Sequence, residues 1–175
     1  MKPHTMLVGT SKSKNKEGYY HASKEKVWGL LARAKVTTTL YGPTDYKILE
    51  EKHGIIFYDL IGKIASSDKQ LKEDPEAIIA GVKKFLKHLD DNPSIKHVLF
   101  NGKNAATWIF NYLTACQEKR NEVNPLQKIK GLNFGIQDMN YGKTNFYVMP
   151  NTSPIASKHW CEKPWMDFWK SIAKR

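Results

Sequence analysis

The sequence predicts a three-layer α/β/α sandwich around a central four-stranded parallel sheet. Short apolar runs alternate along the chain with stretches whose apolar residues recur at helical spacing. Each run is apolar on both faces, which is typical of parallel strands covered by helices. The alternation of strand and helix favours one sheet with helices on both sides.

Four runs are expected to form the strands: residues 5–9, 55–61, 96–102 and 145–150. The clearest helix follows the second run, where Asp74 and Pro75 suit the N-cap and the first helical position. Its apolar stripe comprises Ile78, Ile79, Val82, Phe85, Leu86 and Leu89. Three further helices are expected, at residues 24–34, after Gly102, and at residues 164–173.

The stretch from Thr114 to Thr144 has no clear periodicity and contains several lysines and three glycines. We interpret it as the end of a helix followed by a long basic loop. The whole chain, residues 1–175, is expected to be a single domain, because its length and its 41% hydrophobic content suit one core.

The charge balance is strongly basic, with 28 Lys and Arg against 17 Asp and Glu and a net charge of +11. The basic residues are spread along the chain rather than confined to a tail. This distribution favours a polyanionic partner such as DNA. The alternative is a lysine-rich soluble surface with no role in nucleic-acid binding.

Cysteine content and hydropathy exclude several classes of protein. Cys116 and Cys161 are too few for a disulfide framework or a four-cysteine metal site, and His159 beside Cys161 forms only half of a metal site. We therefore expect no metal and no cofactor. No apolar run approaches a signal sequence or the roughly 20 residues of a membrane span. A cytoplasmic monomer with no membrane association is expected.

Ligands of open α/β sheets bind beyond the carboxyl ends of the strands, so the residues that follow each run are the first candidates for a site. These segments read GTSKS, DLIG, NGKNA and PNTSP. The first resembles a phosphate loop, but it lacks the second glycine before the lysine that the Walker pattern requires.

Taken in order, the motifs are GYYHASKEKVWGLL after a glycine-ended first strand, then GIIFYDLI, VLFNGKNA and VMPNTSP. This set is similar to the uracil-DNA glycosylase superfamily, and most closely to its hypoxanthine-DNA glycosylase and mismatch-specific branches. The resemblance extends over residues 5–160, and VMPNTSP is its most specific part.

The resemblance implies a monofunctional DNA glycosylase of base-excision repair. Such an enzyme flips a deaminated base, of the uracil or hypoxanthine type, out of DNA and hydrolyses its N-glycosidic bond. The residues expected to bind the base are Gly9, Thr10, Tyr19, Tyr20, Phe57, Asn101 and Asn151. Those expected to contact DNA are Ser11, Lys12, Pro150, Thr152, Ser153, Pro154 and Ile155, of which Ile155 would fill the vacated stack.

Two carboxylates are the catalytic candidates. Asp59 stands where uracil-specific relatives have an asparagine that reads the pyrimidine edge, and an ionised carboxylate accepts hydrogen bonds but cannot donate them. Purine deamination products with a ring N–H therefore fit Asp59 better than uracil does. Glu25 occupies the position of an asparagine in the hypoxanthine branch, and we expect it over the mouth of the pocket.

Each assignment has a structural alternative. Asp59 could cap a turn, Glu25 could serve only the helix dipole, and the tyrosines could be packing residues. Residues 150–155, the proline-bracketed hook, could be a capping turn. The first motif also lacks the usual Asp, Asn or Glu after its glycine, and has Thr10 and Ser11 instead. This departure favours a second hypothesis, a catalytically weakened member that binds DNA or damaged bases without cleavage. A third hypothesis is a small-molecule enzyme, for instance a nucleotide-binding transferase, but the sequence lacks the glycine fingerprints of such enzymes.

Overall fold

A computed structural model describes residues 1–12, 17–64 and 68–173. The side chains of Lys12 and Ile155, two of the expected DNA contacts, lie outside the described part. The five strands are β1 (Thr5–Lys12), β2 (Ile55–Ile64), β3 (His97–Asn101), β4 (Gly135–Tyr141) and β5 (Thr144–Met149).

The strands form one mixed sheet in the order β2-β1-β3-β5-β4. The pairings of β1 with β2, β1 with β3, and β3 with β5 are parallel, which confirms the parallel strands expected from the apolar runs. The expectation of only four strands is wrong, because β4 adds to the edge of the sheet, antiparallel to β5.

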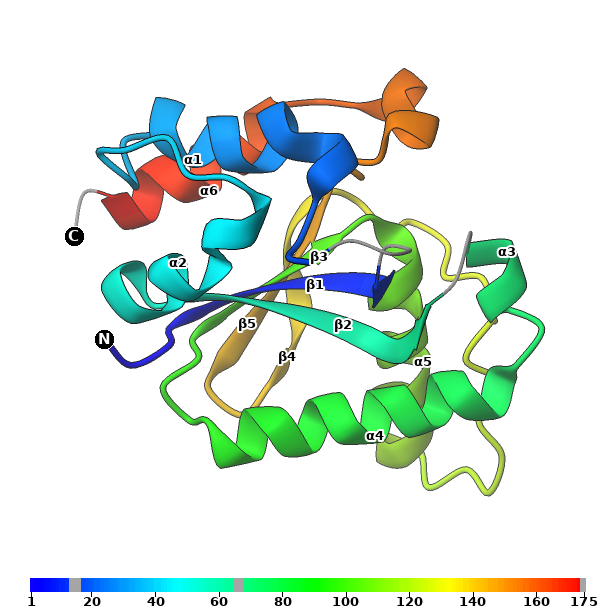
Figure 1. The fold of residues 1–175 in the computed structure, drawn as a ribbon. Helices are drawn as coiled ribbons and strands as arrows, with labels where there is room; N and C mark the ends of the chain where they lie inside the picture. Colours follow the sequence, from blue (N-terminus) through cyan, green and yellow to red (C-terminus); the bar gives the residue numbers. More distant parts are fainter. Residues whose placement is uncertain (13–16, 65–67, 174–175) are drawn as a thin grey trace.

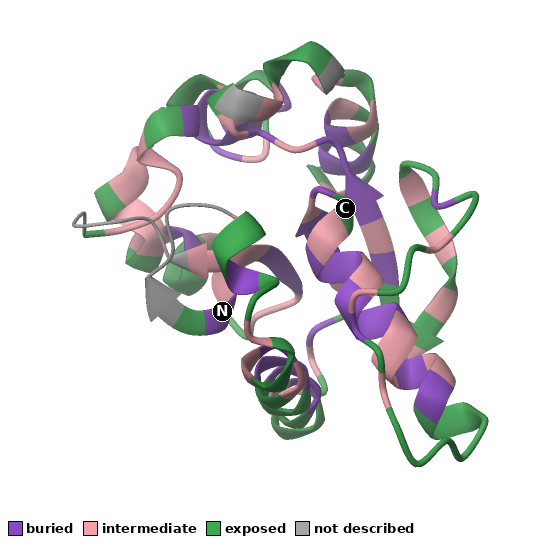
Figure 2. Ribbon diagram, turned by 90° about the vertical axis from the view of Figure 1, so that its right-hand side faces the viewer, coloured by how far each residue is buried: buried purple, intermediate pink, exposed green. Residues whose placement is uncertain are grey.

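The new strand lies within the stretch that we interpreted as a long loop. Its residues alternate between exposed and half-buried, as Figure 2 shows, so it lacks the continuous apolar run by which the other strands were found. The turn before β5 contains Gly142 at φ 57°, a left-handed conformation that favours glycine.

Helices cover both faces of the sheet, so the three-layer α/β/α arrangement holds (Figure 1). On one face lie α4 (Pro75–Asp91) and α5 (Lys103–Gln117), with the short α3 (Asp68–Leu71) beside them. On the other face lie α1 (Leu30–Arg33), α2 (Tyr46–His53) and α6 (Lys163–Ala173). Short 3₁₀ turns lie at His21–Ser23, Pro43–Asp45 and Pro154–His159. A π-helical turn, Glu25–Gly29, leads into α1.

Local sequence explains how the helices begin and end. The Asp74 carboxylate accepts the backbone N–H of Ala77 at 3.0 Å, which confirms the expected N-cap of α4. The helix α2 was not expected, since Leu49 is its only buried residue in the described structure and no apolar stripe marks it. It ends at Gly54, whose φ of 61° is the left-handed conformation of a helix C-cap.

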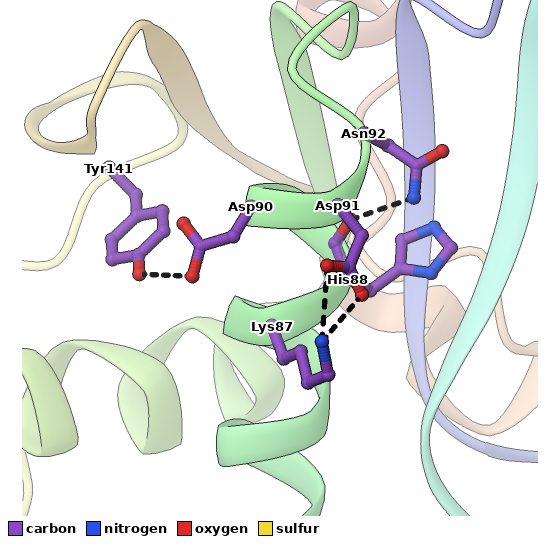
Figure 3. Close-up of polar contacts among 6 residues, drawn as sticks. All are labelled: Lys87, His88, Asp90, Asp91, Asn92 and Tyr141. Atoms are coloured by element: carbon purple, nitrogen blue, oxygen red, sulfur yellow. Dashed lines mark hydrogen bonds and ion pairs between the residues drawn. The ribbon is translucent and has the colours of Figure 1, made fainter.

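Polar contacts fix the end of α4 to the edge of the sheet. The Tyr141 hydroxyl of β4 donates to the Asp90 carboxylate at 3.1 Å, and Lys87 pairs with Asp91 one turn along the same helix (Figure 3). The Asn92 side chain donates to the backbone oxygen of His88 at 2.9 Å. The bond from Tyr141 joins β4 to α4, whereas the other two contacts lie within α4 and at its carboxyl end.

The core is divided by the sheet into two apolar clusters. Residues at alternate positions of each strand enter opposite clusters: Met6, Val98 and Phe146 pack with α4 and α5, whereas Leu7 and Leu99 pack with α1 and α6. This alternation decides which strand-end residues share a face.

Candidate functional site

Three strand-end residues face the same side of the sheet. Gly9, Asp59 and Asn101 each lie two positions after a residue of the cluster under α1 and α6, which is Leu7, Phe57 or Leu99. Gly9 is also paired in register with Asp59 on the neighbouring strand β2. The structure therefore brings together three of the expected site residues at the carboxyl ends of β1, β2 and β3.

Gly9 forms the floor of this arrangement. A Cβ atom at residue 9 would lie 3.5 Å from the Asp59 Oδ1 atom and 3.5 Å from the Tyr20 hydroxyl oxygen. Both distances are ordinary van der Waals contacts. The carboxylate and the hydroxyl therefore border the space that a side chain of residue 9 would occupy. Any residue longer than alanine would displace them.

Tyr20 is held in an unusual backbone conformation. Its φ of 58° lies in the left-handed region, which residues other than glycine rarely adopt, and bulky ones least of all. Burial raises the pKa of the Tyr20 hydroxyl, and the neighbouring Asp59 carboxylate raises it further, while a hydrogen bond with Asn101 acts in the opposite direction. The hydroxyl therefore stays protonated at neutral pH.

An aromatic cluster stands beside these polar groups. Tyr19 stacks on Phe57 with ring centroids 5.1 Å apart and planes inclined by 20°, and Tyr46 meets the edge of Tyr19 at 5.3 Å. Trp28 packs on Phe57 at 5.2 Å and donates its indole N–H to the Tyr19 carbonyl oxygen at 3.0 Å. Phe57 is thus covered by other rings, so it supports the tyrosines.

Tyr19 is half-buried in the same cluster. Burial and then the Asp59 carboxylate raise the pKa of its hydroxyl to about 12, so it too remains neutral. The backbone N–H of Tyr19 donates to the Pro43 oxygen at 3.1 Å. Gly18 allows this approach, because a Cβ there would lie 2.0 Å from the same oxygen and the residue has φ 88°.

The proline-bracketed hook is anchored to the third strand end by a reciprocal pair. Asn101 donates its Nδ2 to the Thr152 hydroxyl at 3.0 Å and accepts the Thr152 backbone N–H on its Oδ1 at 2.9 Å. The Ser23 hydroxyl donates to the Thr152 carbonyl at 2.8 Å, and the Trp165 indole donates to the Pro150 carbonyl at 2.8 Å.

These contacts correct two of the expected DNA contacts. Thr152 has no exposed surface and Pro150 is buried, so neither is placed to touch a duplex, and both hold the hook in the core. Ser153 is half-buried and Pro154 is exposed, so the outward part of the hook begins at residue 153. The alternative interpretation of a capping turn therefore fits the buried half of the hook.

Asn151 shapes the hook from within. Its Oδ1 accepts the Ser153 backbone N–H at 2.8 Å, which closes a turn of the type that Asn favours. Its side chain also packs on Gly102, where a Cβ would lie 3.1 Å from the Asn151 Nδ2 atom. Asn151 therefore links the end of β5 to the start of α5.

Thr10 and Ser11, the residues after Gly9, point to opposite faces of the sheet. The Thr10 hydroxyl donates to the Asp68 carboxylate at 2.7 Å, and the Asn104 amide donates to the other oxygen of Asp68. This cluster belongs to α3 and α5, across the sheet from Tyr20. Thr10 is therefore not brought to the base site, while Ser11 is half-buried on β1.

Glu25 is also away from the expected position over the pocket. Its side chain is 77% exposed and lies 4.0 Å from the Arg33 guanidinium, which forms a second ion pair with Glu162 at 3.0 Å. A Cβ on Gly29 would lie 2.7 Å from the Glu25 carboxylate, which shows that the side chain points along the helix. The structure thus places Glu25 in a surface ion-pair network.

Sequence reasoning missed Ser23, Tyr46 and Trp165 as supports of the site. Tyr46 lies on the unexpected helix α2, and Ser23 and Trp165 contact the hook from segments distant in sequence. Only tertiary packing joins them, so no local pattern could have identified them.

Comparison with known proteins adds no relative: no family model matches the chain, and no curated protein matches it. Within the described ranges, no helix is both long and apolar enough to cross a membrane. The same ranges contain no group of three or more His, Cys, Asp or Glu residues arranged to hold a metal ion.

Proposed function

We propose that this chain is a monofunctional DNA glycosylase that flips out a deaminated base and hydrolyses its N-glycosidic bond. The observation that carries the proposal is the convergence of Asp59 and Tyr20 over Gly9, with Asn101 hydrogen-bonded to the Tyr20 hydroxyl. A carboxylate, a protonated hydroxyl and an amide can together bind a base edge and assist its departure. They lie at the carboxyl edge of the parallel strands, where ligands of such sheets bind.

The roles follow from the chemistry of each group. The bond between sugar C1′ and the base nitrogen breaks, a water oxygen bonds to C1′, and the proton released by the water balances the charge on the departing base. Asp59, as a carboxylate, orients the water or stabilises the positive charge that develops on the sugar. Tyr20 donates a hydrogen bond to the base, which carries negative charge as it leaves, and the hydrogen bond with Asn101 positions the Tyr20 hydroxyl.

The hook acts indirectly in this proposal. Pro150 and Thr152 are internal, so contact with DNA falls to Ser153 and Pro154 and to the exposed positions around them. The reciprocal pair of Asn101 and Thr152 joins the base site to the hook. Contact with a phosphate beside the flipped nucleotide is thereby coupled to the position of the Asn101 amide.

An assay of base excision tests the proposal. Oligonucleotides with one uracil, hypoxanthine or xanthine, each as single strand and duplex, are incubated with the protein and then treated with alkali to cleave abasic sites. Asp59→Asn should lower excision of hypoxanthine by at least about a hundredfold. Asp138→Asn, at an exposed position of β4, is the matched control and should leave the rate unchanged.

The substitution at residue 59 also tests specificity. Asparagine can donate as well as accept, so the residual activity of Asp59→Asn should shift toward uracil relative to hypoxanthine. Equal rates for Asp59→Asn and wild type on every lesion would exclude Asp59 from the reaction.

A second candidate is a member that binds damaged bases without cleaving them. The observation that favours it is the engagement of Thr10 with Asp68 and of Glu25 with Arg33, which leaves Asp59 as the sole catalytic candidate near the site among the described residues. Tight, lesion-dependent binding without any alkali-sensitive product would support this candidate over the enzyme.

A further inference from the structure

A basic cleft of about 640 Å³ lies beside the amino-terminal half of α5. Its apolar lining is Trp108, Leu126, Ile129 and Leu132, which belong to or pack against the cluster under α4 and α5. The cleft is therefore on the face of the sheet opposite Tyr20 and Asp59. Its wall carries four lysines: Lys72, Lys103, Lys128 and Lys130. Among the described residues that line it, none is acidic.

The four lysines of this cleft are not paired with carboxylates of the described residues. All four are exposed. Elsewhere on the surface Lys87 and Lys163 are each paired with an aspartate one turn along their helices. A cluster of unpaired ammonium groups around a hollow is a favourable place for an anion.

The cleft continues along α5. A second hollow of about 280 Å³ shares Lys128 and Ile129 with the first and extends to Arg120, just beyond the end of the helix. A helix of 15 residues is about 22 Å long, which is enough for several consecutive phosphates. Asn111 fixes the outer wall, because its side chain donates to the carbonyls of Pro125 at 2.9 Å and Gln127 at 2.7 Å.

An exposed aromatic ring stands at one end of this groove. Phe134 is 40% exposed, next to the lining residue Asn133, and the Lys103 ammonium lies 5.1 Å from its ring centroid. Proteins that bind single-stranded nucleic acids combine these elements, a positive groove that follows the backbone and an aromatic face on which bases stack.

We propose that the groove between α5 and residues 124–134, the α5 groove, binds an unpaired strand of nucleic acid. The lysines contact the phosphates, and Phe134 stacks on an exposed base. A paired duplex keeps its base faces covered along its length and offers none to Phe134. The inference goes beyond base excision, because it uses none of the residues of the Tyr20, Asp59 and Asn101 site and requires no catalysis.

Binding of lesion-free oligonucleotides by fluorescence anisotropy tests the proposal. The probes are an oligothymidylate of about 15 nucleotides and a duplex of the same length. A triple variant, Lys72→Gln, Lys103→Gln and Lys130→Gln, should lower affinity for the single strand at least about tenfold at low salt. Its salt dependence should become shallower by about 2 log units per log unit of salt, since each phosphate on a single strand contributes about 0.7.

The control triple variant removes the same charge from exposed positions outside the groove: Lys47→Gln, Lys83→Gln and Lys170→Gln. It should bind the single strand within about twofold of wild type. Equal losses in the two triple variants would overturn the proposal, because the attraction would then come from net charge alone.

Phe134→Ala separates stacking from charge. It should lower affinity for the single strand by about fivefold or more while leaving the salt dependence and duplex binding unchanged. Unaltered single-strand binding in this variant, or equally effective competition by polyglutamate, would refute the assignment to an unpaired strand. Because the probes carry no lesion, absence of base excision would leave this test intact, and the two proposals can fail separately.

Discussion

Asn101 and Thr152 form a two-way hydrogen-bonded pair that joins the end of β3 to the hook after β5. The Asn101 amide donates to the Thr152 hydroxyl at 3.0 Å, and its oxygen accepts the Thr152 backbone N–H at 2.9 Å. Thr152 has no exposed surface, so solvent cannot replace either bond without opening the core. The same Asn101 amide belongs to the base site, and the position of the hook therefore determines the position of a site residue.

Thr152→Val should destabilise the protein by about 1–2 kcal/mol, because valine keeps the shape but leaves the Asn101 amide without its acceptor. Chemical unfolding measures the loss. Ser153→Ala is the control: the Ser153 backbone N–H makes the bond to Asn151, so its half-buried side chain should matter little. Equal stability of the two variants would contradict the internal role of Thr152.

Gly81→Ala should destabilise the protein by about 2 kcal/mol or more, although alanine is the better helix former by about 1 kcal/mol. A Cβ at residue 81 would lie 2.4 Å from the Leu60 carbonyl oxygen, a backbone atom of β2 that cannot move aside. The clash would force α4 away from the sheet. Thermal melting should show a clear decrease in Tm.

Gly62→Ala is the matched control for this substitution. Gly62 lies in β2, close to Leu60 in sequence, and no described atom is within 4 Å of its Cβ position. The change should alter stability by no more than about 0.5 kcal/mol. A stabilised Gly81→Ala variant would mean that α4 is packed less closely on β2 than this geometry indicates.

The sequence predicted those parts of the fold that depend on continuous apolar patterning. The parallel strands and the helices α4, α5 and α6 have such patterns, and the alternation of side chains places Gly9, Asp59 and Asn101 on one face. The edge strand β4 was missed because only one of its faces is half-buried and it alternates with polar residues.

The site was predictable at its strand ends and not at its supports. Residues directly after apolar strands are identified by position, which is how Asp59 and Asn101 were found. Whether a hydroxyl faces outward or is bonded inside depends on tertiary partners, and Thr152 meets Asn101 51 positions away in sequence. Glu25 was misplaced for a similar reason, because Arg33 draws its carboxylate along the helix surface.

Glu25→Gln should leave base excision within about threefold of wild type, since the carboxylate is 77% exposed and pairs with Arg33 rather than with the base site. Stability should also change little, because exposed ion pairs contribute only about 0–1 kcal/mol. Steady-state excision of hypoxanthine from an oligonucleotide is the measurement. A fall of a hundredfold or more would restore Glu25 as a catalytic residue and require its side chain to reorient when DNA binds.

His88 gives the protein a sensitivity to acid. Its Nε2 atom is buried without a hydrogen-bond partner among the described residues, and its ring packs against Tyr58 with centroids 5.2 Å apart (Figure 3 shows its position on α4). Burial lowers the pKa of the His88 imidazole below its ordinary value of 6.5, and the carboxylates of Asp91 and Glu50 offset only part of that effect. The folded protein therefore resists protonation at this residue.

Because the unfolded chain takes up a proton at His88 more readily than the folded protein does, stability should fall as the pH falls below about 6.5. Burial also lowers the pKa of His4 and His53, so they contribute in the same direction. His88→Phe keeps a ring against Tyr58 and removes the titration. The free energy of unfolding, measured at about pH 7.5 and pH 5, should decrease less in this variant than in wild type. Parallel losses in the two proteins would show that His88 is protonated as easily in the folded state as in the unfolded chain, and that the acid sensitivity originates at other groups.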